Sequence, residues 1–229
     1  MQEVLKVVTK AQAIFRLKIE LLERSGGLTI EQYVRYLSMQ HHLTRDVQRH
    51  FFLIASHSSL ATKPKLRKFL VEFGLEEEPH YRIAQKDLEH LGQELLPIPL
   101  EVKLWWSYFD SIINSRPFVR LGATCILENL GSGGSDVIKR LLLNAEFITQ
   151  QSSHFIRIHL HEELPHGDQI VNALQNEELS SQMLNDLKEG AETGAILYLR
   201  MLDWVLGTDL LVNAILGESQ FYEQTCLRS

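Results

Sequence analysis

Residues 3–24, EVLKVVTKAQAIFRLKIELLER, indicate the fold class of this chain. Apolar residues recur there at the spacing of an α-helix that buries one wide face. They are Val4, Leu5, Val7, Val8, Ala11, Ile14, Phe15, Leu17, Ile19 and Leu22. The pair Gly26 and Gly27 follows and is typical of a helix end. The chain is therefore expected to begin with a long amphipathic helix.

The same helical period continues through the rest of the chain. Thr29 is a candidate N-cap for a long second helix that extends to about residue 57. Further helices are expected at 66–73, ending at Gly74, and at 80–91, 100–114, 118–130, 135–143, 145–161 and about 179–206. No stretch alternates apolar and polar residues as a strand does. The sequence predicts one all-α domain, 1–229, built as a helical bundle of about seven main helices.

Composition excludes several classes of function. The chain has 23 Lys and Arg against 29 Asp and Glu, a net charge of −6, so nucleic-acid binding is not expected. Its longest apolar stretches are too short to span a bilayer. The N-terminus lacks the pattern of a secretory signal, and there are two cysteines, which together favour a cytoplasmic protein.

Residues 159–166, HLHEELPH, are unusually rich in metal-binding side chains. They do not form a zinc-peptidase motif, because that motif needs two histidines four residues apart with Glu directly after the first. His159, Glu163 and His166 instead lie within about 60° of one another on a helix. Two imidazoles and a carboxylate suit iron or manganese. A surface-exposed polar helix end is the alternative interpretation of this segment.

Two other segments offer ligands that could complete such a site. Glu128, in GATCILENLG, is the one charged residue between Arg120 and Asp136, and a buried carboxylate needs a metal or a charged partner such as Arg120. In LVEFGLEEEPH, Glu72 lies near a helix end and His80 begins the next helix. The neighbouring Glu76, Glu77 and Glu78 are alternatives to Glu72, and as a run they are typical of a solvated acidic loop.

These residues resemble the pattern of the heme-oxygenase-like diiron oxidases and oxygenases, relatives of thiaminase-II-like and pyrroloquinoline-quinone synthase proteins. The resemblance covers most of the chain and implies a heme-oxygenase-like helical fold. It implies six metal ligands: Glu72, His80, Glu128, His159, Glu163 and His166. Glu163 stands where the family usually has Asp, and Pro165 departs from the pattern because it disfavours helical geometry before His166.

The resemblance implies two Fe(II) ions, with manganese as an alternative, and O2 as co-substrate for the oxidation of a small organic substrate. Glu128 is the expected catalytic carboxylate, and a homodimer is compatible with the resemblance. Two other functions remain open. One is a cofactor-free hydrolase or quinone-synthase-like oxidase of the same fold; the hydrolase would use a pocket cysteine such as Cys125. The other is a non-catalytic protein that binds a metal or a small ligand.

Overall fold

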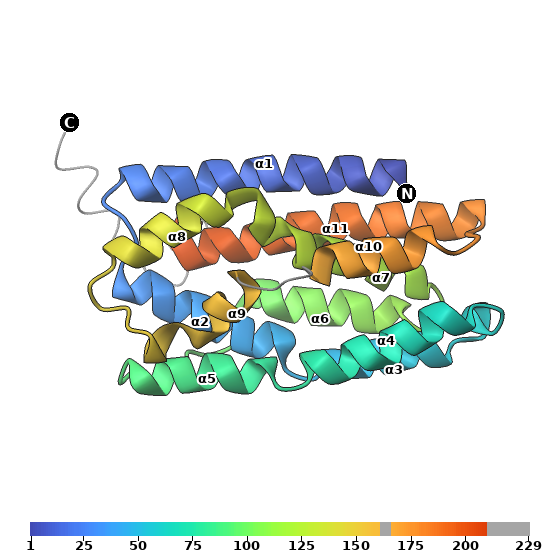
Figure 1. The fold of residues 1–229 in the computed structure, drawn as a ribbon, viewed down its shortest axis with the longest axis horizontal. Helices are drawn as coiled ribbons and strands as arrows, with labels where there is room; N and C mark the ends of the chain where they lie inside the picture. Colours follow the sequence, from blue (N-terminus) through green and yellow to red (C-terminus); the bar gives the residue numbers. More distant parts are fainter. Residues whose placement is uncertain (161–165, 210–229) are drawn as a thin grey trace.

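The structure is a computed structural model that describes residues 1–160 and 166–209. All regular structure within these residues is helical, which confirms the all-α prediction (Figure 1). The α-helices are α1 (Gln2–Arg24), α2 (Ile30–Thr44), α3 (Val47–Ser56), α4 (Pro64–Glu77), α5 (His80–His90), α6 (Leu100–Ile112), α7 (Pro117–Leu130), α8 (Ser135–Asn144), α9 (His154–Leu160), α10 (His166–Gln175) and α11 (Ser181–Leu206). No helix in these two ranges is long and apolar enough to cross a membrane.

The first helix and the start of the second follow the sequence prediction. The buried face of α1 consists of Val4, Val8, Ala11, Phe15, Ile19 and Leu22. Gly26 and Gly27 then take positive φ values of 118° and 87°, which turn the chain. The Thr29 side chain accepts a hydrogen bond from the Gln32 backbone, and the Gln32 side chain accepts one from the Thr29 backbone. This reciprocal capping box fixes the start of α2.

The predicted single helix over 29–57 is wrong, because the chain turns at residues 45–46. α2 ends at Thr44, and α3 begins at Val47. Asp46 between them has a φ of 66°, a left-handed conformation that Asp adopts more readily than most residues. As a result, α2 packs on α5 while α3 packs on α4.

The predicted helix end at Gly74 is also wrong, because α4 continues to Glu77. A glycine inside a helix costs about 1 kcal/mol relative to alanine. Packing offsets that cost here: the ring of Phe73 lies 5.0 Å from the ring of Phe51 on α3. Glu77 consequently sits in the last turn of α4 instead of in a loop, and His80 starts α5.

The predicted helix over 145–161 is wrong in its first part, since residues 145–150 are not helical and α9 begins only at His154. Thr149 and Ser152 divert the backbone there. The Thr149 hydroxyl accepts from the Ser152 backbone N–H at 3.2 Å, and the Ser152 hydroxyl accepts from the Thr149 N–H at 3.0 Å. Such side-chain bonds compete with a continuous helix and delay its start.

The start of α9 is also held by another helix. Asp87 of α5 accepts a hydrogen bond from the backbone N–H of Phe155 at 2.8 Å. α10, which begins at His166, was not predicted from the sequence. Residues 161–165 lie outside the described residues.

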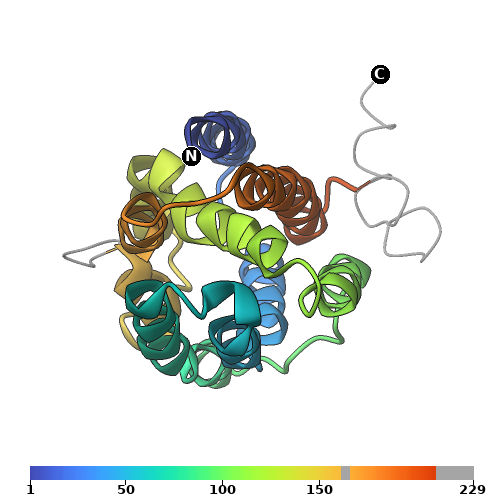
Figure 2. The same ribbon diagram turned by 90° about the vertical axis from the view of Figure 1, so that its right-hand side faces the viewer.

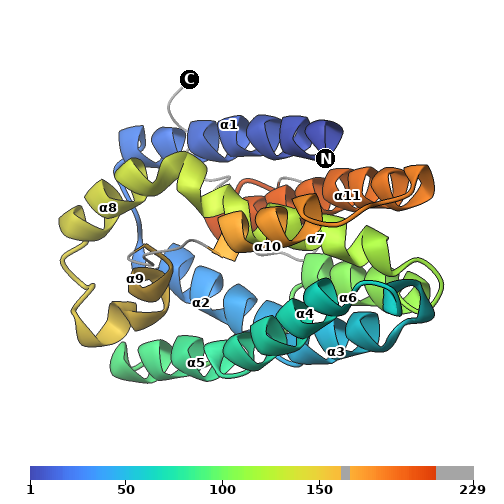
Figure 3. The ribbon, with the colours of Figure 1, turned by 45° about the vertical axis from the view of Figure 1, so that its right-hand side comes forward.

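The helix α7 lies at the centre of the bundle. It contacts α1, α3, α6, α10 and α11, and these helices surround it in the end-on view of Figure 2. α7 and α11 approach so closely that a Cβ at Gly190 would lie 1.7 Å from the carbonyl oxygen of Val119. On another side of α7, α10 contacts both α7 and α4 (Figure 3). This arrangement brings the end of α4, the last turns of α7 and the start of α10 together.

Candidate metal centre

Glu77, Glu128 and His166 form a compact cluster of metal-binding side chains. Each residue offers one donor atom, and these atoms all lie within 4.8 Å of one another. His166 Nδ1 is 2.9 Å from Glu77 Oε1 and 3.7 Å from Glu128 Oε2. The three residues come from α4, α7 and α10, so the cluster joins three helices.

Glu77 is the most buried carboxylate of the cluster, with 5% of the residue exposed. Its Oε2 accepts a hydrogen bond from His80 Nδ1 at 2.7 Å, across the junction of α4 and α5. Its Oε1 is buried and makes no hydrogen bond within the described residues, but it forms an ion-pair contact with His166 Nδ1 at 2.9 Å. A buried carboxylate oxygen without a hydrogen bond is costly unless a charged group or a metal lies beside it.

The cluster strongly perturbs the acidity of its members. Burial raises the pKa of Glu77, but the contacts with His166 and His80 outweigh burial and lower that pKa well below its ordinary value. Burial, followed by the negative charge of Glu77, raises the pKa of Glu128. Burial lowers the pKa of His166, but Glu128 and Glu77 outweigh it and raise that pKa above its ordinary value. The two carboxylates therefore stabilise a positive charge on His166, and they would stabilise a metal cation in the same way once this imidazole loses its proton.

His80 and His159 extend the cluster toward α9. The rings of His80 and His159 lie 5.1 Å apart, and those of His80 and His166 lie 6.2 Å apart and stacked. His159 Nδ1 is 2.7 Å from the carbonyl oxygen of Phe155. Because a carbonyl only accepts, the Nδ1 atom of His159 carries a proton. In the same way, the Nδ1 atom of His80 carries a proton, which it donates to Glu77 Oε2.

The close approach of His166 to α7 depends on its neighbour in sequence. A Cβ on Gly167 would lie 2.4 Å from Asn129 Oδ1, so a glycine at this position lets the first turn of α10 rest against α7 beside Glu128. The Asn129 side chain is itself held, because its Nδ2 donates to the carbonyl oxygen of Cys125 at 2.8 Å. On its other side the His166 ring packs edge-on against Phe73 at 4.9 Å.

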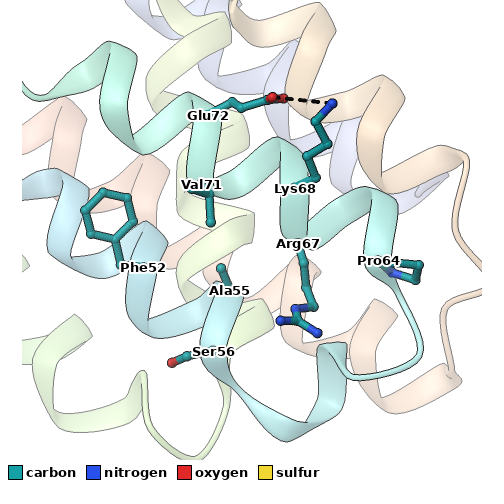
Figure 4. A pocket seen from close by; sticks show the side chains of 8 residues that line it. All are labelled: Phe52, Ala55, Ser56, Pro64, Arg67, Lys68, Val71 and Glu72. Atoms are coloured by element: carbon teal, nitrogen blue, oxygen red, sulfur yellow. Dashed lines mark ion pairs between the residues drawn. The ribbon is translucent and has the colours of Figure 1, made fainter.

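Glu72 does not join the cluster, and the preference for it over Glu77 is corrected by the structure. Its side chain is 58% exposed and pairs with Lys68 at 3.5 Å. Figure 4 shows this pair at the edge of a shallow hollow between α3 and α4 that also includes Phe52 and Val71. Glu72 and Glu77 are five residues apart on one helix, so they face in different directions.

The other five predicted ligands are not placed as Glu72 is. The structure brings His80, Glu128, His159 and His166 together, whereas Glu163 lies outside the described residues. The alternative ion pair between Glu128 and Arg120 is not formed, since Arg120 donates to His50 and Thr124 instead.

Glu77 was one of three alternatives to Glu72, and a signal that favours it was present in the sequence. Glu77 and His80 have the Glu-x-x-His spacing with which helical bundles often bind metals, and so do Glu163 and His166.

A cavity of about 340 Å³ adjoins the cluster. Glu77, Glu128 and His159 form part of its lining, and apolar side chains of α1, α2, α8 and α11 form most of the rest. Its polar features include Gln40 and Tyr198, where Gln40 Nε2 donates to Tyr198 Oη at 3.0 Å. A small molecule with an apolar body fits this space beside the carboxylates.

Cys125 is not placed to act as a nucleophile. It is fully buried in α7 and does not line the cavity. Burial, and to a lesser degree the charge of Glu128, raises the pKa of the Cys125 thiol to about 12. A thiol held protonated in an apolar interior is unreactive. The structure therefore does not support a hydrolase that uses Cys125.

The residues present fit a metal centre. Glu77, Glu128 and His166 supply two oxygen donors and one nitrogen donor around a common point, and the buried Oε1 of Glu77 makes no hydrogen bond in the described part of the chain. Carboxylate and imidazole donors without thiolates suit iron or manganese in a helical bundle.

The fold is similar to a crystal structure of a domain of unknown function from Shewanella denitrificans, which has a heme oxygenase-like fold. The two structures match with a TM-score of 0.74 over 90% of each chain, at 19% sequence identity. No protein-family model and no curated protein matches the sequence. The chain therefore has a heme-oxygenase-like helical fold, and at this identity the similarity establishes the fold alone.

Proposed function

We propose that this protein is a non-heme diiron oxidase or oxygenase that uses O2 to oxidise a small organic substrate. The observation that carries the proposal is the convergence of Glu77, Glu128 and His166 from three helices, with their donor atoms within 4.8 Å. A structural ion pair would need only two of these groups. A metal ion could bind both carboxylates at once, and the nearby imidazoles would supply its nitrogen ligands.

The proposed ligands are Glu77, His80, Glu128, His159 and His166, with Glu163 as a sixth that lies outside the described residues. Three carboxylates and three imidazoles are enough donors for two ions. Bound ferrous ions would supply the electrons for reduction of O2. The carboxylates would balance the charge of the ions, and the hydrogen bonds that His80 and His159 make through Nδ1 would orient each ring.

The cavity determines what the site can act on. Its walls are mainly apolar, so they exclude water and hold the apolar body of a substrate next to Glu77 and Glu128. The Tyr198 hydroxyl oxygen accepts from Gln40, which leaves its O–H free to donate to a substrate oxygen or nitrogen. These groups orient the substrate, with its oxidisable atom toward the carboxylates.

Anaerobic titration with Fe(II), followed by exposure to O2, tests the proposal. We expect the protein to bind about two irons per chain, as two-metal carboxylate sites in helical bundles do. We also expect it to consume O2 and to show a transient visible absorption band. Glu77→Gln and Glu128→Gln should each weaken iron binding by at least about 100-fold, because even outer-shell changes cost 10-fold to 100-fold. Glu72→Gln is the matched control on the same helix and should bind iron as the wild type does.

Other outcomes would count against the proposal. Iron binding without O2 consumption would identify a metal-binding protein and not an oxidase. The absence of iron binding, or an equal loss in Glu72→Gln and Glu77→Gln, would refute the proposed centre. Competition between Fe(II) and Mn(II) would establish which metal the same donors prefer.

A further inference from the structure

Arg120 of α7 is a fully buried cation whose hydrogen-bond partners among residues 1–160 and 166–209 include no acidic side chain. Its Nε donates to His50 Nδ1 at 3.0 Å, and its Nη1 donates to Thr124 Oγ1 at 2.7 Å. Its Nη2 is buried and makes no hydrogen bond within the described residues. Burial lowers the pKa of Arg120 to about 10, so the guanidinium still carries its charge at pH 7. Such a charge is costly to bury and needs compensation.

Aromatic rings provide part of this compensation. The guanidinium carbon lies 5.7 Å from the ring centre of Phe51, 5.4 Å from that of Trp105 and 5.5 Å from that of Phe109. Cation–π contacts of this kind stabilise a cation more strongly when it is desolvated than at an exposed site. Trp105 and Phe109 thus have a packing role around Arg120.

His50 and Asp110 hold the guanidinium in position. A guanidinium only donates, so His50 Nδ1 must be unprotonated, and the ring proton lies on Nε2. That N–H donates to Asp110 Oδ1 at 2.8 Å, and Asp110 also accepts from Arg49 Nη2 at 2.6 Å. The Asp110 side chain is 43% exposed, so a continuous series of hydrogen bonds extends from the surface to Arg120.

The guanidinium lies close enough to the metal cluster for the charges of Glu128 and Glu77 to act on it. Arg120, Thr124 and Glu128 are four residues apart in turn, so they lie on one stripe of α7. Because a helix rises about 1.5 Å per residue, Thr124 and Glu128 are about 6 Å apart along the axis. Packed rings also connect Arg120 with the cluster: Phe51 lies beside the guanidinium and packs on Phe73, which packs on His166. The charges that act on Arg120 are those of Glu128, Glu77 and Asp110.

We propose that Arg120 is a fixed positive charge that raises the reduction potential of iron held by Glu77, Glu128 and His166, with His50, Asp110 and Thr124 as its positioning residues. The inference rests on the proposed function, because it concerns iron at that cluster. A nearby cation disfavours loss of an electron from Fe(II) to give Fe(III), since the ferric ion carries one more positive charge. In a low-dielectric interior this effect is much stronger than in water.

Two variants of Arg120 separate its charge from its packing. Arg120→Met removes the charge and keeps a long side chain, whereas Arg120→Lys keeps the charge and loses the forked hydrogen bonds. The full chain is loaded with iron, its iron content is measured, and the midpoint potential is recorded by mediated spectroelectrochemistry. We expect a lower potential in Arg120→Met and a potential near that of the wild type in Arg120→Lys.

Equal potentials in the wild type and Arg120→Met would overturn the inference, and so would equal shifts in the Met and Lys variants, which would indicate a structural effect. Thr124→Val decides the question if Arg120→Met does not fold. It removes the Nη1 acceptor without changing any charge, so it should lower the potential by less than the Met variant, and an unchanged potential would contradict the proposal. A wild-type protein that binds no iron would refute the proposed function itself.

Discussion

At the scale of single residues, His50 makes stability depend on pH. Burial, followed by the positive charge of Arg120, lowers the pKa of His50 to about 3 in the folded protein, whereas an unfolded histidine has a pKa of about 6.5. Between these values the unfolded chain binds a proton that folded His50 does not. The free energy of unfolding should therefore fall as the pH drops from about 6.5 to about 3, by up to about 1.4 kcal/mol per pH unit from this residue.

Urea unfolding at several pH values measures this dependence in the wild type and in His50→Gln. The glutamine amide still accepts from Arg120 and donates to Asp110, but it does not titrate. We expect the slope of stability against pH to be shallower in His50→Gln over this range. Equal slopes in the two proteins would show that His50 takes up a proton in the folded state.

The sequence was informative about single residues where a polar side chain interrupts an apolar pattern. Glu128 stood out for this reason, and the spacing of His159 and His166 suggested a shared face; the structure brings all three close together. Glu77 could not be preferred over its neighbours, because Glu76, Glu77 and Glu78 form a run typical of solvated charges. Which of the three turns inward depends on where α4 ends, and a local pattern does not specify that point.

At the scale of secondary-structure elements, the start of α10 depends on the small size of Gly167. Alanine there would place a Cβ 2.4 Å from Asn129 Oδ1, and the Asn129 side chain is held by its bond to Cys125. Gly167→Ala should move the first turn of α10 away from α7, destabilise the protein by about 1–3 kcal/mol and weaken metal binding through His166. Thermal unfolding and Co(II) titration measure the two effects.

Two further variants serve as controls for Gly167→Ala. A Cβ at Gly131 would meet no atom within 4 Å, so Gly131→Ala should leave both properties nearly unchanged. Asn129→Ala combined with Gly167→Ala removes the clashing amide and should recover part of the metal affinity. If Gly131→Ala and Gly167→Ala lost the same stability, the contact with Asn129 would not be the cause.

Helices were predictable as elements, but their boundaries depended on tertiary contacts. Gly74 is typical of a helix end, yet α4 continues past it because Phe73 packs on Phe51. The pattern of residues 29–57 predicts one helix, yet Asp46 takes a left-handed conformation and separates α2 from α3. The start of α9 depends on Asp87 from α5, a bond between residues 68 positions apart that no local pattern contains.

At the scale of the whole molecule, the sequence indicated the fold class and four residues that the structure brings together, His80, Glu128, His159 and His166, but not how these residues converge. The cluster exists because α7 lies at the centre of the bundle and α4 and α10 meet near its end. Close approaches, such as Gly190 against Val119, determine how the helices pack. The cavity beside the cluster is lined from several helices, so its shape is a property of the assembled bundle.

Because Glu77, Glu128 and His166 come from three helices, a bound metal should stabilise the whole bundle. A ligand that binds only the folded state at 100 times its Kd adds about 2.7 kcal/mol to the free energy of unfolding. We expect Co(II) at that concentration to stabilise the wild type and Glu72→Gln by this amount, and Glu77→Gln by much less. Urea unfolding with and without Co(II) measures the difference, and the chelator EDTA should reverse it. Equal stabilisation of Glu77→Gln would place the metal elsewhere, whereas no stabilisation of the wild type would mean that these helices meet without needing a metal.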